Sequence, residues 1–102
     1  MATEQDPLFS ITRSLWDRVT PDLRGVAYEI SDSALRVRFV YAVEPDVQTV
    51  ELVSEAETEC IADFWQSHEV SYFATHLPND QPRDLEPGER WVFLRYEPPR
   101  PV

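Results

Sequence analysis

The chain has 102 residues, and 19 aspartates and glutamates against 9 arginines give it a formal net charge of −10. A protein that binds nucleic acid must supply cations to the phosphates, so this balance excludes ordinary nucleic-acid binding. The length predicts one domain over residues 1–102, with an ordered core over about 7–97 and an extended, proline-rich tail over 98–102.

The first half of the chain predicts a helix and a hairpin. Asp6-Pro7 is a typical helix start, and the apolar stripe that follows stops at Thr20-Pro21. Residues 23–31 alternate apolar and other side chains, which indicates a half-buried strand. Residues 34–43 alternate in the same way after a short turn, so the two strands are expected to form an antiparallel hairpin.

The second half predicts a helix and two more strands. Glu44-Pro45 ends the hairpin and opens a helix that continues to Phe64. Residues 70–77 are expected to form a third strand, and residues 78–89 a polar loop whose prolines forbid regular structure. Residues 90–97 form the last expected strand, with Trp91 and Phe93 facing away from Val92.

The order α-β-β-α-β-β predicts an α+β fold, a two-layer sandwich in which two helices cover one face of a four-stranded, largely antiparallel sheet. On the uncovered face, arginines from the hairpin are expected to meet aromatic residues of the last strand. These residues either protect the sheet by stacking on one another or form a second contact surface, such as a homodimer seam. The residues concerned are Arg36, Arg38, Trp91, Phe93 and Arg95.

The helix that ends at Phe64 carries the most distinctive pattern. Its carboxylates recur every four residues and form a stripe of Glu51, Glu55, Glu59 and Asp63, opposite an apolar sector of Val50, Val53, Ser54, Cys60, Ile61 and Phe64. Each like-charge contact along such a stripe costs about 0.2–0.5 kcal/mol. No arginine occurs between Phe39 and Pro82. The stripe is either a solvated surface or a surface that meets a basic partner.

Glu57 is the acidic residue that departs from this pattern, because it falls within the apolar sector. A carboxylate buried there without a partner would be costly. We expect it at the edge of the sector, with its carboxylate reaching water or an arginine of the first helix such as Arg13. A buried functional acid is the alternative.

Enzyme chemistry is not indicated. The two glycines form no phosphate-binding loop, and His68 and His76 have no metal-site spacing. Cys60 is expected to be a buried apolar side chain. We therefore expect no catalytic activity, no metal and no cofactor. The absence of a signal sequence or of an apolar run of about 18 residues favours a cytoplasmic protein without a membrane partner.

Four segments together suggest a family: TPDLRGVAYEI, LRVRFVYAVEP, ETECIADF and WVFLRYE. Their spacing over roughly residues 12–97 resembles that of small acidic bacterial immunity proteins from contact-dependent and polymorphic toxin systems. The resemblance implies a protein that neutralises a cognate toxin, and it carries over no set of binding residues.

The resemblance and the charge lead to one interpretation. An acidic helix can cover the phosphate-binding surface of a cationic, nuclease-type toxin, while aromatic anchors slow dissociation. The stripe from Glu51 to Asp63 would cover the cationic surface of the toxin. Trp65, Tyr72 and Trp91 would be the aromatic anchors that slow dissociation. The alternatives are an acidic mimic of DNA that inhibits a nucleic-acid-binding protein, or an adaptor for one, and, further away, a small enzyme.

Overall fold

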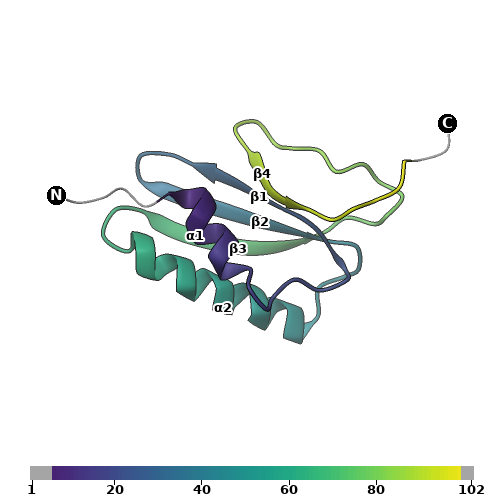
Figure 1. Ribbon diagram of the computed structural model, residues 1–102, viewed down its shortest axis with the longest axis horizontal. Helices are drawn as coiled ribbons and strands as arrows, with labels where there is room; N and C mark the ends of the chain where they lie inside the picture. Colours follow the sequence, from purple (N-terminus) through teal and green to yellow (C-terminus); the bar gives the residue numbers. More distant parts are fainter. Residues whose placement is uncertain (1–5, 100–102) are drawn as a thin grey trace.

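Two helices and four strands follow one another along residues 6–99, the part of the chain that the computed structural model describes. Their order is the predicted one, and residues 100–102 of the predicted tail lie outside the described range (Figure 1). The elements are α1 (Pro7–Ser14), β1 (Leu23–Ile30), β2 (Ala34–Tyr41), α2 (Val47–Phe64), β3 (Glu69–His76) and β4 (Arg90–Leu94).

Aspartates begin both helices. The Asp6 carboxylate accepts a hydrogen bond from the backbone N–H of Leu8, and that of Asp46 accepts one from Thr49. Each satisfies an N–H group that has no partner within its helix. The first helix ends at Ser14, before the predicted Thr20-Pro21, because the chain leaves the helical conformation at Asp17, where φ is 65°.

The sheet is mixed, whereas the sequence predicted a largely antiparallel one. Its strand order is β3-β2-β1-β4; β1 pairs antiparallel with β2 and with β4, and β2 pairs parallel with β3. The difference arises at α2. This helix spans 18 residues between β2 and β3 and carries the chain back along the sheet, as a parallel pairing requires.

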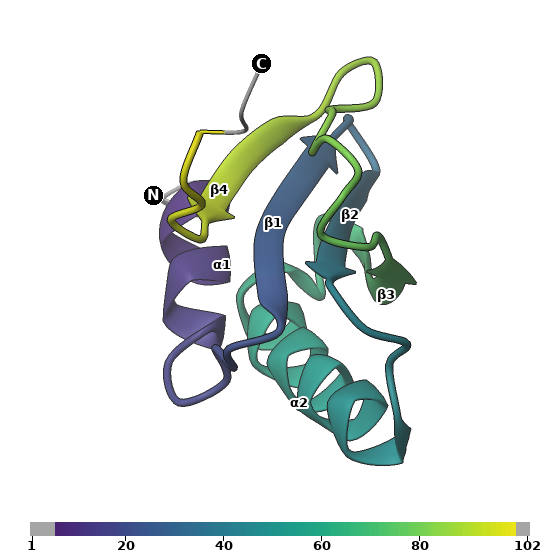
Figure 2. The same ribbon diagram turned by 90° about the vertical axis from the view of Figure 1, so that its right-hand side faces the viewer.

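Both helices lie on one face of the sheet, as predicted, and the core fills the space between the two layers (Figures 1 and 2). Four α2 residues point into this core: Val53, Ala56, Cys60 and Phe64. Three members of the predicted apolar sector do not, since Val50 is 54% exposed, Ile61 is 37% exposed and Ser54 is also exposed. Val53, Cys60 and Phe64 of that sector are buried as predicted, and the buried side of α2 is shifted from the sector toward Ala56.

A β-bulge changes the faces of β4. Phe93 pairs with Val26, but Trp91 pairs with Ala27, so Val92 is the extra residue between them. Phe93 consequently packs against the core, while Trp91 lies on the opposite face over Gly25. The prediction that Trp91 and Phe93 share a face is wrong, because strict alternation assumes an unbroken register.

The loop over residues 77–89 covers part of the sheet face that the helices leave open. Arg38 reaches its Glu89 with an N–O distance of 2.6 Å, and the guanidinium of Arg36 lies over the Phe73 ring at 5.2 Å. Arg95 instead hydrogen-bonds the carbonyl of Pro21. The register places Arg38 and Trp91 on the same face, on either side of Ala27. These contacts of the three arginines go to other partners, and Phe93 lies against the core, so the predicted group is only partly assembled.

Candidate functional site

Three of the four stripe carboxylates are exposed on α2, and they are Glu51, Glu55 and Glu59. Asp63 differs, because its side chain is only 15% exposed. It accepts hydrogen bonds from the Ser10 hydroxyl and from the Arg13 guanidinium. Burial raises the pKa of this carboxyl, but these two donors outweigh burial and hold the pKa below its ordinary value. Asp63 thus joins α2 to α1.

The stripe is also less repulsive than the α2 segment alone suggests. Arg18, which follows α1, lies beside it with N–O distances of 3.1 Å to Glu59 and 3.8 Å to Glu55. Glu51 forms no ion pair within residues 6–99. The helical pattern did not predict the ion pairs of Arg13 and Arg18 with α2, because both arginines come from a segment more than thirty residues earlier. The acidic surface is therefore partly neutralised at its α1 side and uncompensated at Glu51.

The three candidate aromatic anchors lie in three different environments. Trp65 is 68% exposed and directly follows α2. Trp91 is partly buried over Gly25 on the face away from the helices. Tyr72 is buried beside Phe39, and its hydroxyl lies 2.8 Å from the Ser14 hydroxyl. Of the three, only Trp65 is therefore exposed at the end of the helix that carries the stripe.

Glu57 has a partner that the sequence did not suggest. Its carboxylate accepts a hydrogen bond of 2.8 Å from the backbone N–H of Tyr72 on β3. Arg13, the expected partner, contacts Asp63 instead. Since β3 is an edge strand, Glu57 satisfies a backbone group that no further strand pairs with.

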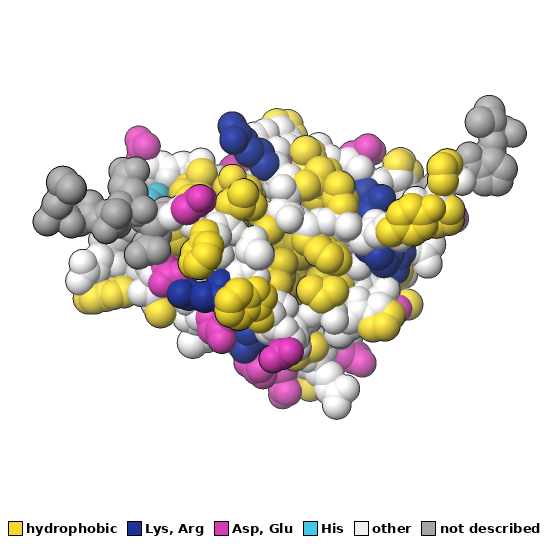
Figure 3. All heavy atoms as spheres, in the orientation of Figure 1, with side chains coloured by type: hydrophobic (Ala, Val, Ile, Leu, Met, Phe, Trp, Pro, Cys, Tyr) yellow, Lys and Arg dark blue, Asp and Glu magenta, His cyan; other side chains and the backbone are white. Residues whose placement is uncertain are grey.

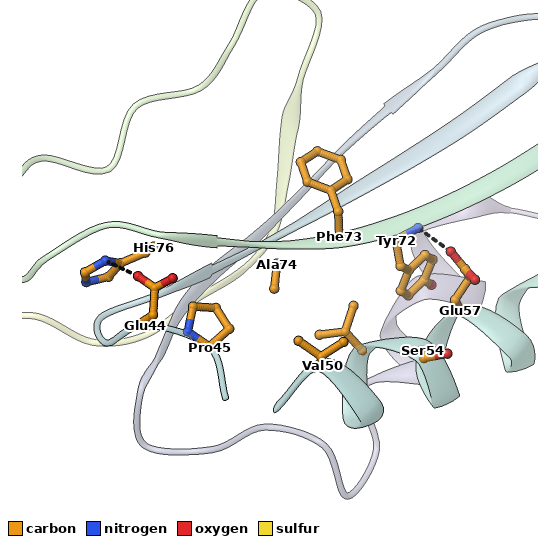
Figure 4. A pocket seen from close by; sticks show the side chains of 10 residues that line it. Glu44, Pro45, Val50, Ser54, Glu57, Tyr72, Phe73, Ala74 and His76 are labelled. Atoms are coloured by element: carbon orange, nitrogen blue, oxygen red, sulfur yellow. Dashed lines mark hydrogen bonds and ion pairs between the residues drawn. The ribbon is translucent and has the colours of Figure 1, made fainter. Parts of the chain in front are cut away.

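A hollow of about 490 Å³ opens beside Glu57, between the first half of α2 and β3 (Figure 4). Apolar side chains of α2 and β3 face each other across it, and two carboxylates stand at its ends. One of them, Glu44, pairs with the His76 ring at 3.2 Å. The lining residues are Glu44, Pro45, Val50, Val53, Ser54, Glu57, Tyr72, Phe73, Ala74 and His76.

An apolar patch lies on another side of the molecule, where α1 approaches β4. Trp16 is 65% exposed there, above a shallow hollow of about 370 Å³ that Val19, Val92 and Phe93 also line. Figure 3 shows apolar side chains gathered in the middle of this face and acidic ones along the lower edge, where Figure 1 places α2. Trp16 belongs to the apolar stripe predicted between Asp6-Pro7 and Thr20-Pro21, a pattern that gave no sign that its side chain would be exposed.

Chemistry at a reactive side chain has little support within residues 6–99. They contain no group of three or more histidine, cysteine or acidic residues arranged to hold a metal ion. Burial raises the pKa of the Cys60 thiol, which disfavours the reactive thiolate. No helix in this range is both long enough and apolar enough to cross a membrane. The distinctive features are instead surfaces: the acidic helix, the hollow beside it and the apolar patch.

Exposed charged and apolar surfaces of this kind are typical of the class of proteins that act by binding other macromolecules. The MafI2 immunity protein family matches residues 4–97, nearly the whole chain, and the chain belongs to this family. The resemblance to small bacterial toxin immunity proteins is thereby confirmed. No curated protein matches the chain. Membership indicates toxin immunity as the general role and a non-enzymatic inhibitor as the kind of protein.

Proposed function

We propose that this protein neutralises a single cognate toxin by direct one-to-one binding, and that the exposed side of α2 is its main contact surface. The observation that carries the proposal is the row of exposed carboxylates on α2, together with the exposed indole of Trp65 at the end of the same helix. Interfaces of this kind combine charge, which accelerates encounter, with a buried aromatic anchor, which slows dissociation.

The charge of the surface favours a basic partner. Within the described residues Glu51 has no ion pair, and Glu55 and Glu59 share the single guanidinium of Arg18, so α2 presents an excess of negative charge to the solvent. A nuclease-type toxin is cationic where it holds phosphates, and carboxylates on α2 would occupy that surface. Such binding would exclude the toxin's substrate without any chemical step. The cytoplasm, where nucleic acids are exposed to such a toxin, is the expected compartment.

The structure changes which residues the proposal includes. Glu51, Glu55, Glu59 and Trp65 remain in the proposed interface. Tyr72 is enclosed in the core, and Asp63 is engaged by α1, so both act through the stability of the fold. Trp91 lies on the opposite face, where a homodimer contact stays a prediction and the 77–89 loop already occupies part of the surface.

The test is charge reversal with a matched control. The first variant carries Glu51→Lys, Glu55→Lys and Glu59→Lys. The control carries Asp22→Lys, Asp32→Lys and Asp84→Lys at exposed positions outside α2, so both variants change the net charge equally. Binding of the purified toxin domain encoded beside this gene is measured by surface kinetics, and folding by circular dichroism.

We expect the α2 variant to associate at least about tenfold more slowly, and the control to lose much less, because charges close to the contact dominate steering. Equal losses of association rate in the two variants would show that the net charge of the protein, and not its position on α2, determines the rate. Unchanged binding of a folded α2 variant would remove α2 from the interface. Protection at far below equimolar immunity protein would replace neutralisation by binding with a catalytic mechanism. Failure to bind this toxin domain, with binding to a cellular DNA-binding protein instead, would favour the mimic of DNA.

A further inference from the structure

The outer edge of β3 has backbone groups that point away from the sheet. The N–H of Glu69 donates to the carbonyl of Ser33, and the N–H of Leu77 donates to that of Tyr41, both toward β2. In a parallel pair, alternate residues of a strand face the partner strand. The residues between them, which include Tyr72, Ala74 and His76, therefore direct their N–H and C=O groups outward.

Glu57 satisfies one of these outward groups, the N–H of Tyr72. Further along the strand, Ala74 and His76 line the hollow beside α2 instead (Figure 4). A free edge of this kind is a template for another strand, and proteins usually blunt it with proline, a bulge or a covering segment. Within β3 there is no proline, and its register with β2 is unbroken from Glu69 to His76.

The lining of the hollow indicates which chemistry would fit there. Val50 and Val53 of α2 form an apolar wall opposite Ala74, suited to an apolar side chain. Glu44 and Glu57 place carboxylates at its two ends, and no arginine contributes to the lining. An extended segment alternates its side chains between two faces, so one that pairs with β3 would place every second side chain against α2.

The position of the hollow connects it to the proposed toxin-binding surface. Helical periodicity places Val50, Ser54 and Glu57 on the flank of α2 opposite to the one that Arg18 contacts, with Glu51 between the two flanks. A partner that covers the exposed side of α2 would thus reach the β3 edge without leaving the acidic surface.

We propose that the β3 edge binds an extended segment of the toxin as a fifth strand, with an apolar side chain against Val50 and Val53 and a basic side chain at Glu44 or Glu57. The inference rests on the proposed function and deepens it by stating what kind of toxin segment is recognised. Backbone hydrogen bonds supply the pairing, and the side-chain positions supply selectivity.

The experiment uses the full chain and the purified toxin domain encoded beside this gene. Amide hydrogen exchange is followed by NMR with and without the toxin domain. Val50→Trp fills the hollow, and Val47→Trp is its control, because Val47 is an exposed α2 residue one turn earlier that does not line the hollow. Ala74→Pro removes an outward N–H, and Ala74→Ser keeps it.

We expect the amides of Ala74 and His76 to exchange at least about tenfold more slowly in the complex. Val50→Trp and Ala74→Pro should each raise Kd by about tenfold or more, the equivalent of about 1.4 kcal/mol, with the two controls within about twofold of the natural protein. If Ala74→Pro does not fold, Val50→Trp and the amide exchange decide the question.

Three results would overturn the inference. Toxin binding with unchanged Ala74 and His76 exchange, and with equal affinity for Val50→Trp, would leave the proposed function intact and exclude strand addition. Protection of the same amides in the free protein at high concentration would assign the edge to a second copy of the chain. No binding by the natural protein would instead contradict the proposed function itself.

Discussion

Replacing Glu97 by glutamine is expected to destabilise the protein substantially. The carboxylate of Glu97 forms two hydrogen bonds of 2.9 Å to the guanidinium of Arg24, which is 1% exposed. Arg83 and Arg95 also contact it, at 3.3 and 2.9 Å. Glutamine leaves one neutral acceptor oxygen for three guanidinium groups, and that of Arg24 otherwise keeps the carbonyls of Leu77 and Pro78.

The magnitude follows from the pKa of Glu97. Hydrogen bonds from Arg24, which outweigh the opposing effect of burial, lower this pKa from 4.5 to about 2. Each pKa unit corresponds to about 1.4 kcal/mol, so the charged carboxylate contributes roughly 3 kcal/mol to the free energy of unfolding. Because the pKa is lower in the folded state, this contribution is complete above about pH 5 and is lost as the pH falls toward 2.

The assay is urea unfolding of the natural protein, Glu97→Gln and the control Asp84→Asn at pH 7 and at several values down to pH 3. The free energy of unfolding of Glu97→Gln should be about 2–3 kcal/mol lower than that of the natural protein at pH 7. It should also fall less as the pH is lowered to 3. Asp84 is an exposed loop residue whose replacement should cost less than about 0.5 kcal/mol. A Glu97→Gln variant as stable as the control at pH 7 would refute the reasoning.

Three further predictions concern single residues and the toxin. Gly25→Ala should cost about 1–3 kcal/mol in urea unfolding, because the added Cβ would lie 2.8 Å from the Trp91 ring; an unchanged stability would show that the ring moves freely. Cys60, buried in the core, should react with a thiol reagent only after urea is added, and rapid labelling of the native protein would contradict its burial. Trp65→Ala should weaken toxin binding by about 2 kcal/mol through faster dissociation, whereas added salt should mainly slow association. If Trp65→Ala mainly slowed association and salt mainly accelerated dissociation, the result would be inconsistent with the proposed interface.

The sequence predicted the elements because each carries local signals. Asp6-Pro7 begins α1, and alternation marks the strands. It did not predict the parallel pairing of β3, since local patterns hardly distinguish a strand that returns antiparallel from one that a helix brings back parallel. The bulge at Val92 was missed for a related reason, because an extra residue in a register is a property of two strands together.

In the candidate site, too, the features that depend on one segment were predicted and those that depend on two segments were not. Exposure of Glu51, Glu55 and Glu59 followed from helical periodicity within one segment. The neutralising position of Arg18 and the hydrogen bond from Tyr72 to Glu57 depend on segments that meet only in the folded protein. Tyr72 illustrates the limit clearly, since an aromatic residue in a strand fits a core and an interface equally well until the strand's neighbours are known.

The pairing of Arg24 with Glu97 also has a consequence for biosynthesis. The two residues are 73 positions apart. At a translation rate of about 5–20 residues per second, Glu97 is therefore synthesised several seconds after Arg24. During this interval its charge must stay hydrated, and the beginning of β1 cannot settle into its final buried position. Completion of the sheet is therefore delayed until Glu97 has left the ribosome, and a nascent chain that stalls before Glu97 would present an unfinished β1 to chaperones and proteases.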